Sequence, residues 1–487
     1  MSRLYIQASD VLDKLNTQGG LKTLVFSQKT GGSNKRKLYA LVCETLKYAQ
    51  ILEDVMKLCG LYTNLTQMFR KHFLIVVLYD MLIGKGIEGG GQIKRELKKH
   101  EGALKTALTT IMKERGVTEL KGLLPESVRK SVPMPRYARV NTLKDWGSAP
   151  STPDEIFLQA FREEHADDAS VQIPTKDAHV PHLYRFPPRY DMHDHRWVLD
   201  GHIILQDKSS CFPAYVLAEA LKKDLETTSP RVDVIDACAA PGNKTSQIAA
   251  FLSRGHAENM VHAFDISPKR LELLKSRMKQ AGARNVQCNQ TSFLDVDVEA
   301  YRHVRGVLLD PSCSGSGMSQ RLDHLMDGGD TPERLQALAE FQLSALKHAL
   351  SFPSASHVVY STCSIHEVEN EQVVANALEH LQSLDGGASF HLVPAMPDWP
   401  RRGRAVGGLN TEQAQCLVRC LASKEDATNG FFVALFERTT LEGDAMVEAQ
   451  QRLRRNLKRR EKKKRAKRKR KRNAETEEVT VKKPRAP

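Results

Sequence analysis

Two cysteines follow two apolar segments that have the length and composition of buried strands. Cys313 comes shortly after Gly306–Asp310 in the run Asp-Pro-Ser-Cys-Ser-Gly, and Cys363 directly follows His357–Thr362 in Ser-Thr-Cys-Ser. Reactive groups of open α/β sheets lie just past the carboxyl ends of strands. A cysteine in such polar surroundings can be an exposed thiolate, whereas a packed cysteine is inert. A single cysteine would more often be a small buried residue, but the repeated placement favours chemistry.

The composition allows a folded core that could position these cysteines. The chain has 487 residues, which suggests about three domains, and 41% of them are hydrophobic. Nine cysteines form an odd set without the spacing of a disulfide framework. The start, Met1–Tyr5, carries no apolar signal core, and the most apolar run, Phe73–Ile83, is shorter than the roughly 20 residues that span a bilayer. We expect a soluble, monomeric protein of a reducing compartment, with no membrane partner and no metal site.

The positive charge of the chain is concentrated near its end. The formal net charge is +14, and residues 452–472 hold sixteen lysines or arginines against one acid, Glu461. A charge run is first of all a solvated, disordered segment, but this density also predicts polyanion binding or a nuclear address. Residues 482–485 add a second basic cluster, as a two-part nuclear signal would have. We expect a disordered basic tail over 439–487 and a location in the nucleus, in particular the nucleolus.

The chain divides by composition and pattern into regions that precede this tail. Apolar residues at helical spacing predict a helical region over residues 1–130, with glycine-rich loops at Thr30–Asn34 and Gly84–Gly91. The region could be an interaction module or a plain scaffold. A proline-rich joint then opens a small α+β subdomain over residues 131–206, and the core is predicted over 207–438.

The core alternates short apolar strands with helices, as a doubly wound, Rossmann-like α/β sheet does. The predicted strands are Val232–Asp236, Val261–Asp265, Val286–Cys288, Gly306–Asp310 and His357–Thr362. The predicted helices between them are Asn243–Leu252, Pro268–Ala281 and Pro332–Leu350. A late strand, Gly430–Phe436, is apolar on both faces and is expected to complete the sheet in antiparallel orientation.

A candidate cofactor site follows the first of these strands. After Asp236 the chain reads Ala-Cys-Ala-Ala-Pro-Gly-Asn-Lys-Thr and enters an apolar helix. Small residues before Pro-Gly let the backbone approach a ligand at a helix N-terminus. The run is neither G-x-G-x-x-G nor a P-loop. Asp265 ends the next strand, where an acid would bind ribose hydroxyls, and Arg270 could reach the same ligand. A structural turn explains Pro-Gly about as often, but Pro-Gly together with the acid favours a nucleoside-bearing cofactor.

Together these segments closely resemble the Sun-domain RNA cytosine-5 methyltransferases, which use S-adenosylmethionine. The matching runs are Asp236–Thr245, Ala263–Ser267, Leu309–Gly317, Tyr360–Ser364 with Glu369–Glu371, and Thr428–Ala434. Arg139–Thr142 and Gln206–Ser210 look like the family's small RNA-facing subdomain and the lead into its core. The resemblance implies a class I methyltransferase fold over about residues 131–438. Leu4–Leu12 and Lys22–Phe26 look like the branch that modifies large-subunit ribosomal RNA, so rRNA or a pre-ribosomal particle is the expected partner.

The resemblance also implies roles for individual residues. Cys363 matches the nucleophile, and Cys313 the second cysteine that the family needs to release product. The positions that match the pocket for S-adenosylmethionine are Cys238, Ala239, Ala240, Pro241, Gly242, Asn243, Lys244, Asp265, Arg270 and Asp310. Ser292 departs from the family, which usually places an acid there toward the adenine, so we expect altered cofactor affinity.

The chemistry of this family explains why it needs these residue types. Carbon 5 of cytosine is a poor nucleophile until a thiolate adds at carbon 6 and creates an enamine. Asp310 could stabilise the adduct at N3, and Cys313 could act as or assist the base that removes the carbon 5 proton. Ser364–Glu367 has the pattern of a helix capping box, which predicts a helix N-terminus that lowers the pKa of Cys363. His366 is expected to be an ordinary histidine.

Three alternatives stay open at this point. An amino-group methyltransferase would share the fold, but Asp-Pro-Ser-Cys lacks the aromatic residue that such enzymes carry after Pro-Pro. A catalytically silent RNA-binding ribosome-assembly factor would keep the fold and bury both thiols. Finally, Cys313 rather than Cys363 could attack, as the Pro-Cys cysteine does in DNA cytosine-5 methyltransferases.

Overall fold

A computed structural model describes residues 3–15, 21–26, 32–89, 91–124, 129, 133–147, 151–188, 190–226, 231–318, 331–383 and 390–439. The predicted basic tail lies outside these residues except for its first residue, Thr439. They form two compact units: residues 1–134 with the short segments 314–335 and 421–430, and most of the remaining chain. The domain boundaries predicted above stay a prediction. No helix within the described ranges is long and apolar enough to cross a membrane.

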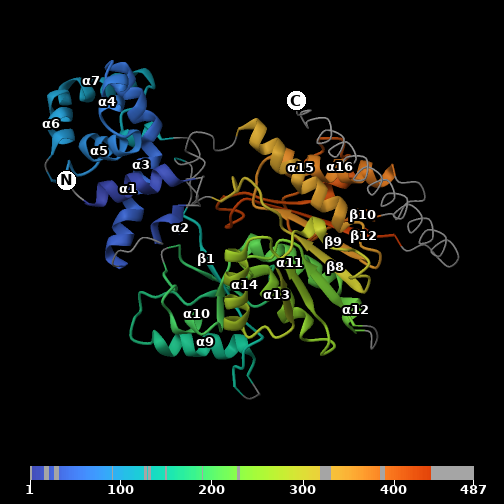
Figure 1. Ribbon diagram of the computed structural model, residues 1–487. Helices are drawn as coiled ribbons and strands as arrows, with labels where there is room; N and C mark the ends of the chain where they lie inside the picture. The colour runs from blue at the N-terminus through green and yellow to red at the C-terminus, as the bar shows by residue number, and fades with distance from the viewer. Residues whose placement is uncertain are drawn as a thin grey trace, which may run out of the picture. The chain divides into compact units, whose positions relative to one another are not determined.

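The N-terminal region is helical, as predicted, and is drawn in blue in Figure 1. Its elements are α1 (Arg3–Lys14), α2 (Leu21–Phe26), α3 (Gly32–Leu58), α4 (Tyr62–Met68), α5 (Lys71–Leu82), α6 (Gln92–Lys99), α7 (Glu101–Glu114) and the 3-10 turn η1 (Leu120–Leu123). They enclose their own apolar core, to which Leu52, Val55 and Leu78 contribute fully buried side chains. The loop predicted at Thr30–Asn34 is wrong from Gly32 onward, because α3 already begins there. Glycine and small polar residues are tolerated in a first helical turn, whose N–H groups have no intrahelical partners.

The small subdomain is an antiparallel sheet covered by a helix. Its strands are β1 (Arg136–Val140), β2 (Thr175–Lys176), β3 (Leu183–Phe186) and β4 (Ile203–Leu205), in the order β2-β3-β1-β4. Its helices are α9 (Pro153–Glu164) and the short α10 (Arg196–Leu199). A capping box of Thr152 and Glu155 with a proline in the first turn begins α9, and Phe157 and Phe161 bury its inner face.

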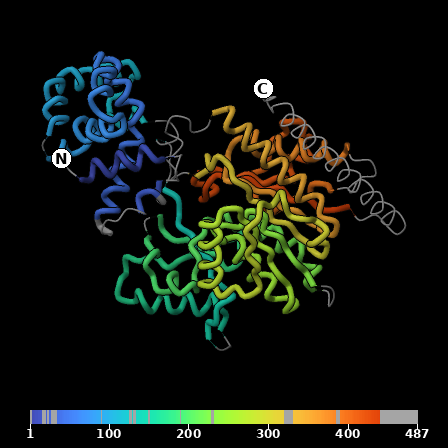
Figure 2. The backbone as a smooth tube through the Cα atoms, viewed as in Figure 1, coloured from blue at the N-terminus to red at the C-terminus, as the bar shows by residue number. Residues whose placement is uncertain are grey.

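The core is the predicted Rossmann-like sheet, and Figures 1 and 2 show its strands running from green through yellow to red. Its strands are β5 (Asp233–Asp236), β6 (Val261–Phe264), β7 (Val286–Asn289), β8 (Val304–Leu309), β9 (His357–Thr362), β10 (Phe390–Val393), β11 (Val418–Cys420) and β12 (Phe431–Arg438). Their order is β10-β12-β9-β8-β5-β6-β7, with β11 paired to β12. The five strands β5 to β9 are parallel and β12 is antiparallel to β9, as predicted. The sequence analysis missed β10 and β11.

Helices cover both faces of this sheet. They are α11 (Lys208–Ala220), α12 (Lys222–Glu226), α13 (Asn243–Leu252), α14 (Pro268–Ala281), α15 (Pro332–Ala349), α16 (Glu371–Gln382) and α17 (Thr411–Cys416). Val234 packs in the cluster that contains α11 and α13, whereas its neighbour Ile235 packs in the cluster that contains α15 and α16. Because both faces are buried, the parallel strands read as continuous apolar runs. This property made them recognisable in the sequence.

The strand order reverses between β5 and β8. From β5 the chain moves to β6 and β7 on one side, and then returns to β8 and β9 on the other. The loops that leave the carboxyl ends of β5 and β8 therefore diverge and open a crevice, which is where ligands bind in sheets of this kind. Asp236 at the end of β5 pairs in register with Leu308 of β8, so the loops after both strands start side by side.

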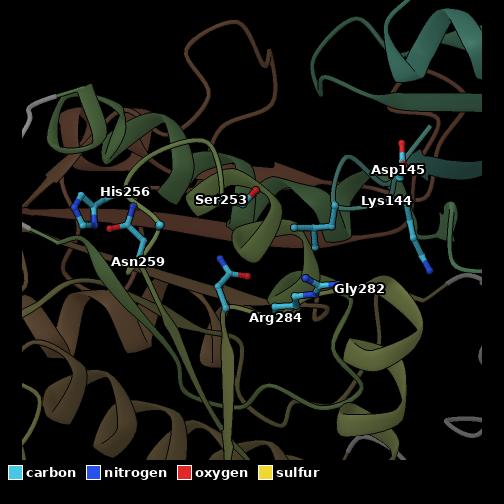
Figure 3. A pocket seen from close by; sticks show the side chains of 10 residues that line it. Lys144, Asp145, Ser253, His256, Asn259, Gly282 and Arg284 are labelled. Carbon is cyan, nitrogen blue, oxygen red and sulfur yellow. The ribbon is translucent and has the colours of Figure 1, made fainter. Parts of the chain in front are cut away.

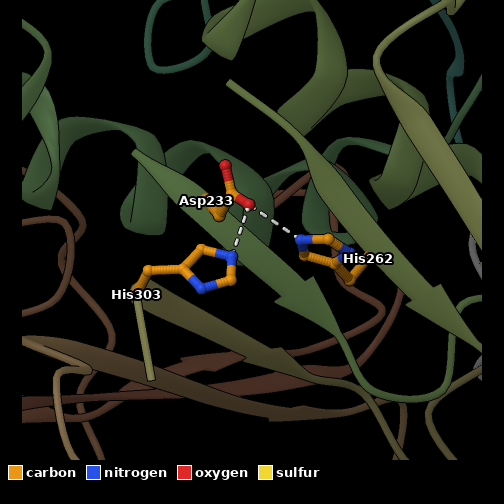
Figure 4. A group of neighbouring side chains, drawn as sticks. All are labelled: Asp233, His262 and His303. Carbon is orange, nitrogen blue, oxygen red and sulfur yellow. Dashed lines mark hydrogen bonds and ion pairs between the residues drawn. The ribbon is translucent and has the colours of Figure 1, made fainter. Parts of the chain in front are cut away.

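The opposite end of β5 is fixed by a buried carboxylate (Figure 4). Asp233 is fully buried, and its Oδ2 lies 2.8 Å from Nε2 of His262 and 3.0 Å from Nε2 of His303. Arg231 donates to both carboxylate oxygens at 2.7 Å, and the backbone N–H of Met260 donates to Oδ1. Asp233, His262 and His303 have the spacing of metal ligands. The Arg231 guanidinium, however, already supplies the positive charge at both oxygens, so the group is explained as a hydrogen-bonded hub.

This hub predicts a pH-dependent contribution to stability. Burial alone would raise the pKa of Asp233, but hydrogen bonds from His262 and Arg231 lower it to about 2. The folded-state pKa is below the unfolded value of about 3.9, so the stabilisation is present above about pH 4 and is lost as the pH falls toward 2. Asp233→Asn should lower the free energy of unfolding by about 2 kcal/mol at pH 7 and by about half as much at pH 3, since the folded carboxyl is still mostly ionised there. Urea unfolding at both pH values measures this difference. Asp295→Asn, at an exposed position, is the matched control and should change little; an equal loss at both pH values for Asp233→Asn would contradict the linkage.

Candidate active site

The two cysteines meet at the carboxyl edge of the core sheet. Leu309 of β8 pairs in register with Tyr360 of β9. The segment after β8 contains Cys313, and the segment after β9 begins with Cys363. The Sγ atoms of Cys313 and Cys363 lie 3.2 Å apart. Both residues are only partly buried, so neither thiol is sealed within the apolar core. This exposure is what a reactive pair needs and is the reverse of what a silent structural pair would show.

An ion pair lies beside the cysteines in the crevice between β5 and β8. Lys244, on the first turn of α13, places Nζ 2.7 Å from Oδ2 of Asp310, which follows β8. Ser361 of β9 donates to Oδ1 of Asp310 at 2.7 Å, and Lys244 also donates to Oγ of Ser210 at 3.2 Å. The ammonium group lies 5.4 Å from the ring centre of Phe431. Both charges are therefore neutralised and held by several elements at once.

The charged groups near the two thiols differ, and this difference favours ionisation of one thiol over the other. Hydrogen bonding to Cys363 is the main reason that the pKa of Cys313 is raised well above its usual value; burial and the carboxylates of Asp310 and Glu369 raise it further. Burial lowers the pKa of Lys244, but Asp310 and also Cys363 raise it, so that the amine stays charged. A nearby cation favours a thiolate. The arrangement therefore favours Cys363 as the thiolate and Cys313 as its protonated neighbour.

The predicted turn after β5 approaches α14 closely. Gly242 caps α13 with a φ of +104°, and a Cβ atom there would lie 2.8 Å from side-chain carbons of Leu274 and Met278. The backbone angle is one that glycine adopts without strain and other residues rarely adopt. Residues 238–241 precede it, with a cis peptide bond before Pro241. The backbone of the turn is thus brought to the N-terminus of α13, the position at which a helix binds anionic or polar ligand groups.

Asp265 and Arg270 lie next to this turn. The backbone N–H of Ala239 bonds to the carbonyl of Phe264, which joins the turn to the end of β6. Asp265 is 5% exposed; its Oδ1 accepts a hydrogen bond from the N–H of Ser267, and Arg270 lies 3.3 Å from its Oδ2. Arg270 also donates to the carbonyl oxygen of Ala240 at 2.6 Å. A buried acid at the second strand end, beside a glycine turn, fits the ribose end of S-adenosylmethionine.

Asp236 is a site residue that the sequence analysis missed. It ends β5, and Thr245 donates to its Oδ2 at 2.7 Å. Burial, and secondarily the charge of Asp310, raise the pKa of Asp236 to about 7 although Thr245 opposes the shift. A carboxyl group that titrates near neutral pH in a crevice is typical of functional sites. Its signal in the sequence was its place at the strand end before the small-residue turn, where it begins the run that resembles the family, but no role was predicted for it.

The helix predicted directly after Cys363 is not there. Ser364 is fully buried and its Oγ accepts a hydrogen bond from the N–H of His366, but only a 3-10 turn, η4 (Glu367–Glu369), follows. The helix α16 begins at Glu371, because Asn370 instead bonds to Thr362 and to the carbonyl of Ser364. Cys363 therefore has no helix N-terminus directly after it. The cation that interacts with it electrostatically is Lys244.

A buried polar network supports the segment that carries Cys313. Gln342 of α15 is fully buried; its Nε2 donates to the carbonyl of Ser312 and to Oε1 of Glu369, both at 3.0 Å. The hydroxyl of Tyr360 donates to the carbonyl of Glu369 at 2.5 Å. Satisfied buried networks of this kind fix one arrangement of the chain. Through the bond from Gln342 to the carbonyl of Ser312, the network fixes the backbone next to Cys313.

The small subdomain is attached to the core through residues that the sequence analysis placed in an RNA-facing motif. Arg139 is 3% exposed and donates to Ser246 of α13 at 2.8 Å and to Gln206 at 3.2 Å. Asn141 is fully buried and donates to the carbonyls of Gly201 and Ala281. These side chains form the joint between the two sheets, so they position the subdomain. Ser292 is half-buried before the turn η2 (Phe293–Asp295), and its effect on cofactor affinity stays a prediction.

A pocket lies beside this joint, away from the cysteines (Figure 3). It has a volume of about 550 Å³ and is lined among others by Lys144, Ser253, His256 and Arg284. The segments that line it precede β6 and β7, so it lies at the amino ends of the parallel strands. It is therefore separate from the crevice that holds Lys244.

Comparisons with known proteins agree with this geometry. Residues 225–437 match the family model described as 16S rRNA methyltransferase RsmB/F. Residues 36–124 and 134–206 match the N-terminal and ferredoxin-like domains of NOL1/NOP2/Sun domain family member 5.

Two relatives that align with most of this chain are named as rRNA (cytosine-C(5))-methyltransferases. A 28S rRNA (cytosine-C(5))-methyltransferase of Mus musculus is 40% identical over 89% of this chain and 91% of its own length. The 25S rRNA (cytosine-C(5))-methyltransferase rcm1 of Schizosaccharomyces pombe is 35% identical over 88% and 90%. The solved structure described as PH0851 has the same fold, with a TM-score of 0.60 and 20% identity over 90% of this chain and 98% of that one. The chain belongs to the Sun-domain family of RNA cytosine-5 methyltransferases, in its NSUN5 branch.

Proposed function

We propose that this protein methylates carbon 5 of a cytosine in large-subunit ribosomal RNA during ribosome biogenesis, with S-adenosylmethionine as the methyl donor. The observation that carries the proposal is the pair of Cys313 and Cys363, 3.2 Å apart at the carboxyl edge of the sheet. The relatives that are 35–40% identical are named for large-subunit rRNA, which supports this substrate. A silent assembly factor has no need for two partly exposed thiols next to a charged lysine.

The chain's own residues can perform the activation of the base. The thiolate of Cys363 adds to carbon 6 of the cytosine, which must first be extruded from any stack, and the ring becomes an enamine. As the thiolate adds, N3 takes up a proton from solvent, and Asp310, held by Lys244 and Ser361, can accept a hydrogen bond from this protonated N3. Because these partners fix the carboxylate before the substrate arrives, its dipoles need little reorganisation during the reaction.

The cofactor contributes one thing, an electrophilic methyl group for carbon 5. The residues that would hold it are the turn Cys238–Lys244 and, at the end of β6, Asp265 with Arg270. After the transfer, the carbon 5 proton must leave so that Cys363 is expelled. Cys313 lies against Cys363 and assists this step. Once Cys363 is bonded to carbon 6, the main cause that keeps Cys313 protonated is removed, so Cys313 can release its own proton to solvent and then accept the proton from carbon 5.

The basic tail supports a proposal about location and partners. Its sixteen cations within residues 452–472 suit contact with RNA phosphates, and their pattern suits a nuclear and nucleolar address. We propose that the protein acts there as a monomer on rRNA or on a pre-ribosomal particle.

The cofactor assignment predicts the effect of removing one acid. Asp265→Ala should weaken binding of S-adenosylmethionine by about 1–3 kcal/mol, because hydrogen bonds to a buried polar ligand are lost. Isothermal calorimetry on the purified protein measures this change. Glu272→Ala, which removes an exposed acid of the neighbouring helix, is the control and should bind as the unaltered protein does. An unchanged affinity for Asp265→Ala would remove Asp265 from the cofactor site.

The roles of the two cysteines predict opposite results for their alanine variants. Cys363→Ala should abolish methyl transfer and form no covalent complex with RNA, since the attacking thiolate is gone. Cys313→Ala should instead accumulate a protein–RNA adduct, because attack and transfer proceed while release stalls. A denaturing gel with rRNA substrate distinguishes them. An adduct in Cys363→Ala with none in Cys313→Ala would assign the attack to Cys313.

Deletion of residues 452–487 tests the role of the tail. The truncated protein should disperse from the nucleus or nucleolus while its melting temperature stays the same. Its RNA binding should depend less steeply on salt, because fewer counterions are released on binding. Fluorescence microscopy and salt titrations measure the two effects. If location and salt dependence are both unchanged, the tail is only a solvated appendage.

A further inference from the structure

The two thiols at the site have the geometry of a pair that can become a disulfide. Their Sγ atoms are 3.2 Å apart, and neither cysteine is in a disulfide. Cys313 and Cys363 lie in the segments that follow the neighbouring parallel strands β8 and β9. The distance between their sulfur atoms exceeds the S–S bond length of about 2.05 Å by only about 1 Å. Bond formation therefore requires the sulfur atoms to approach by about 1 Å and no rearrangement of the sheet.

The surroundings favour oxidation at this pair over oxidation elsewhere. Cys363 is partly exposed and interacts electrostatically with the charged Lys244, so a small oxidant can reach a thiolate. Burial raises the pKa of Cys211 and Cys238 to about 12, and both of these thiols stay protonated. Burial also raises the pKa of Cys416, which lies at the end of α17. The site thus combines an ionised thiol with a second thiol in contact with it.

We propose that Cys313 and Cys363 form a reversible intramolecular disulfide when the protein meets a peroxide. The bond removes the nucleophile, so methyl transfer stops until a dithiol or glutathione reduces it. It also protects Cys363, because a sulfenic acid captured by a neighbouring thiol does not proceed to irreversible sulfinic acid. The consequence for activity rests on the proposed function, whereas the disulfide itself rests only on the geometry.

The reaction balances in two steps. The thiolate of Cys363 attacks one oxygen of hydrogen peroxide, which gives the sulfenic acid and hydroxide. The sulfur of Cys313 then attacks the sulfur of that sulfenic acid; its thiol proton and the departing hydroxyl group leave as water. Each sulfur gives up one electron, and the peroxide takes both. The contact between the two Sγ atoms makes the second step intramolecular, so it precedes attack by a second peroxide.

Mass spectrometry of the full-length protein tests the disulfide directly. The reduced protein is treated with hydrogen peroxide, alkylated and digested. We expect a peptide pair joined through Cys313 and Cys363, and this pair should disappear after dithiothreitol. In Cys313→Ser, Cys363 should instead be found as sulfinic acid that dithiothreitol does not reverse. Cys416→Ser is the control, and the joined pair should form in it as in the unaltered protein. Sulfinic acid at Cys363 of the unaltered protein, a bond to another cysteine, or two free thiols would each overturn the proposal.

A parallel assay of methyl transfer separates this inference from the proposed function. Peroxide should reduce transfer at least about tenfold, and dithiothreitol should restore it, because the loss is a blocked thiol and not an unfolded protein. If the disulfide forms but the reduced protein transfers no methyl group, the proposed function fails and the modification stands. If the reduced protein methylates RNA and peroxide leaves both thiols free, the modification fails and the proposed function stands.

Discussion

The site depends on the ion pair between Lys244 and Asp310 across the reversal of strand order. Lys244 begins the helix after β5, Asp310 follows β8, and their charged atoms are 2.7 Å apart. Both side chains are partly buried, and pairing and hydrogen bonding stabilise their charges there, so the pair ties the loops of both strands to one position. Removing either partner would leave an uncompensated charge in the crevice. The same cation favours the thiolate of Cys363. Lys244 therefore both holds the loops in place and promotes the reactivity of the cysteine.

The sequence predicts those parts of the fold that have local signals. β5, α13, β6 and α14 were recognisable because buried parallel strands are continuously apolar and a small-residue turn links them to amphipathic helices. The short strands β10 and β11 have no such signal, since they exist only through pairing with β12. Ser364–Glu367 shows the opposite error. Its local pattern favours a helix, but the tertiary bonds of Asn370 delay the helix to Glu371.

For the site, too, the sequence predicted some features and missed others. The residue types and strand ends placed Cys313, Cys363 and Asp265 at one edge, and the structure brings the two cysteines together. The properties that depend on burial could not be predicted, because they belong to the packed environment and not to the motif. The pKa of Asp236 near 7 is one such property. The burial of Arg139 in the joint to α13 is another, since an arginine in a polar motif reads as a surface residue until its partners are known.

The surroundings of the two thiols also bear on which of them attacks the base. The hydrogen bond to Cys363 opposes ionisation of Cys313 most strongly, and burial and the carboxylates of Asp310 and Glu369 oppose it further. For Cys313 to act as the nucleophile, a thiolate would have to form beside these negative charges while Cys363, in the field of Lys244, stayed protonated. The charges that surround the pair disfavour both of these protonation states. Attack by Cys363 requires neither, and it leaves Cys313 protonated and in contact with the departing sulfur. The division of labour proposed for the two cysteines thus rests on the placement of one lysine and two acids around the pair.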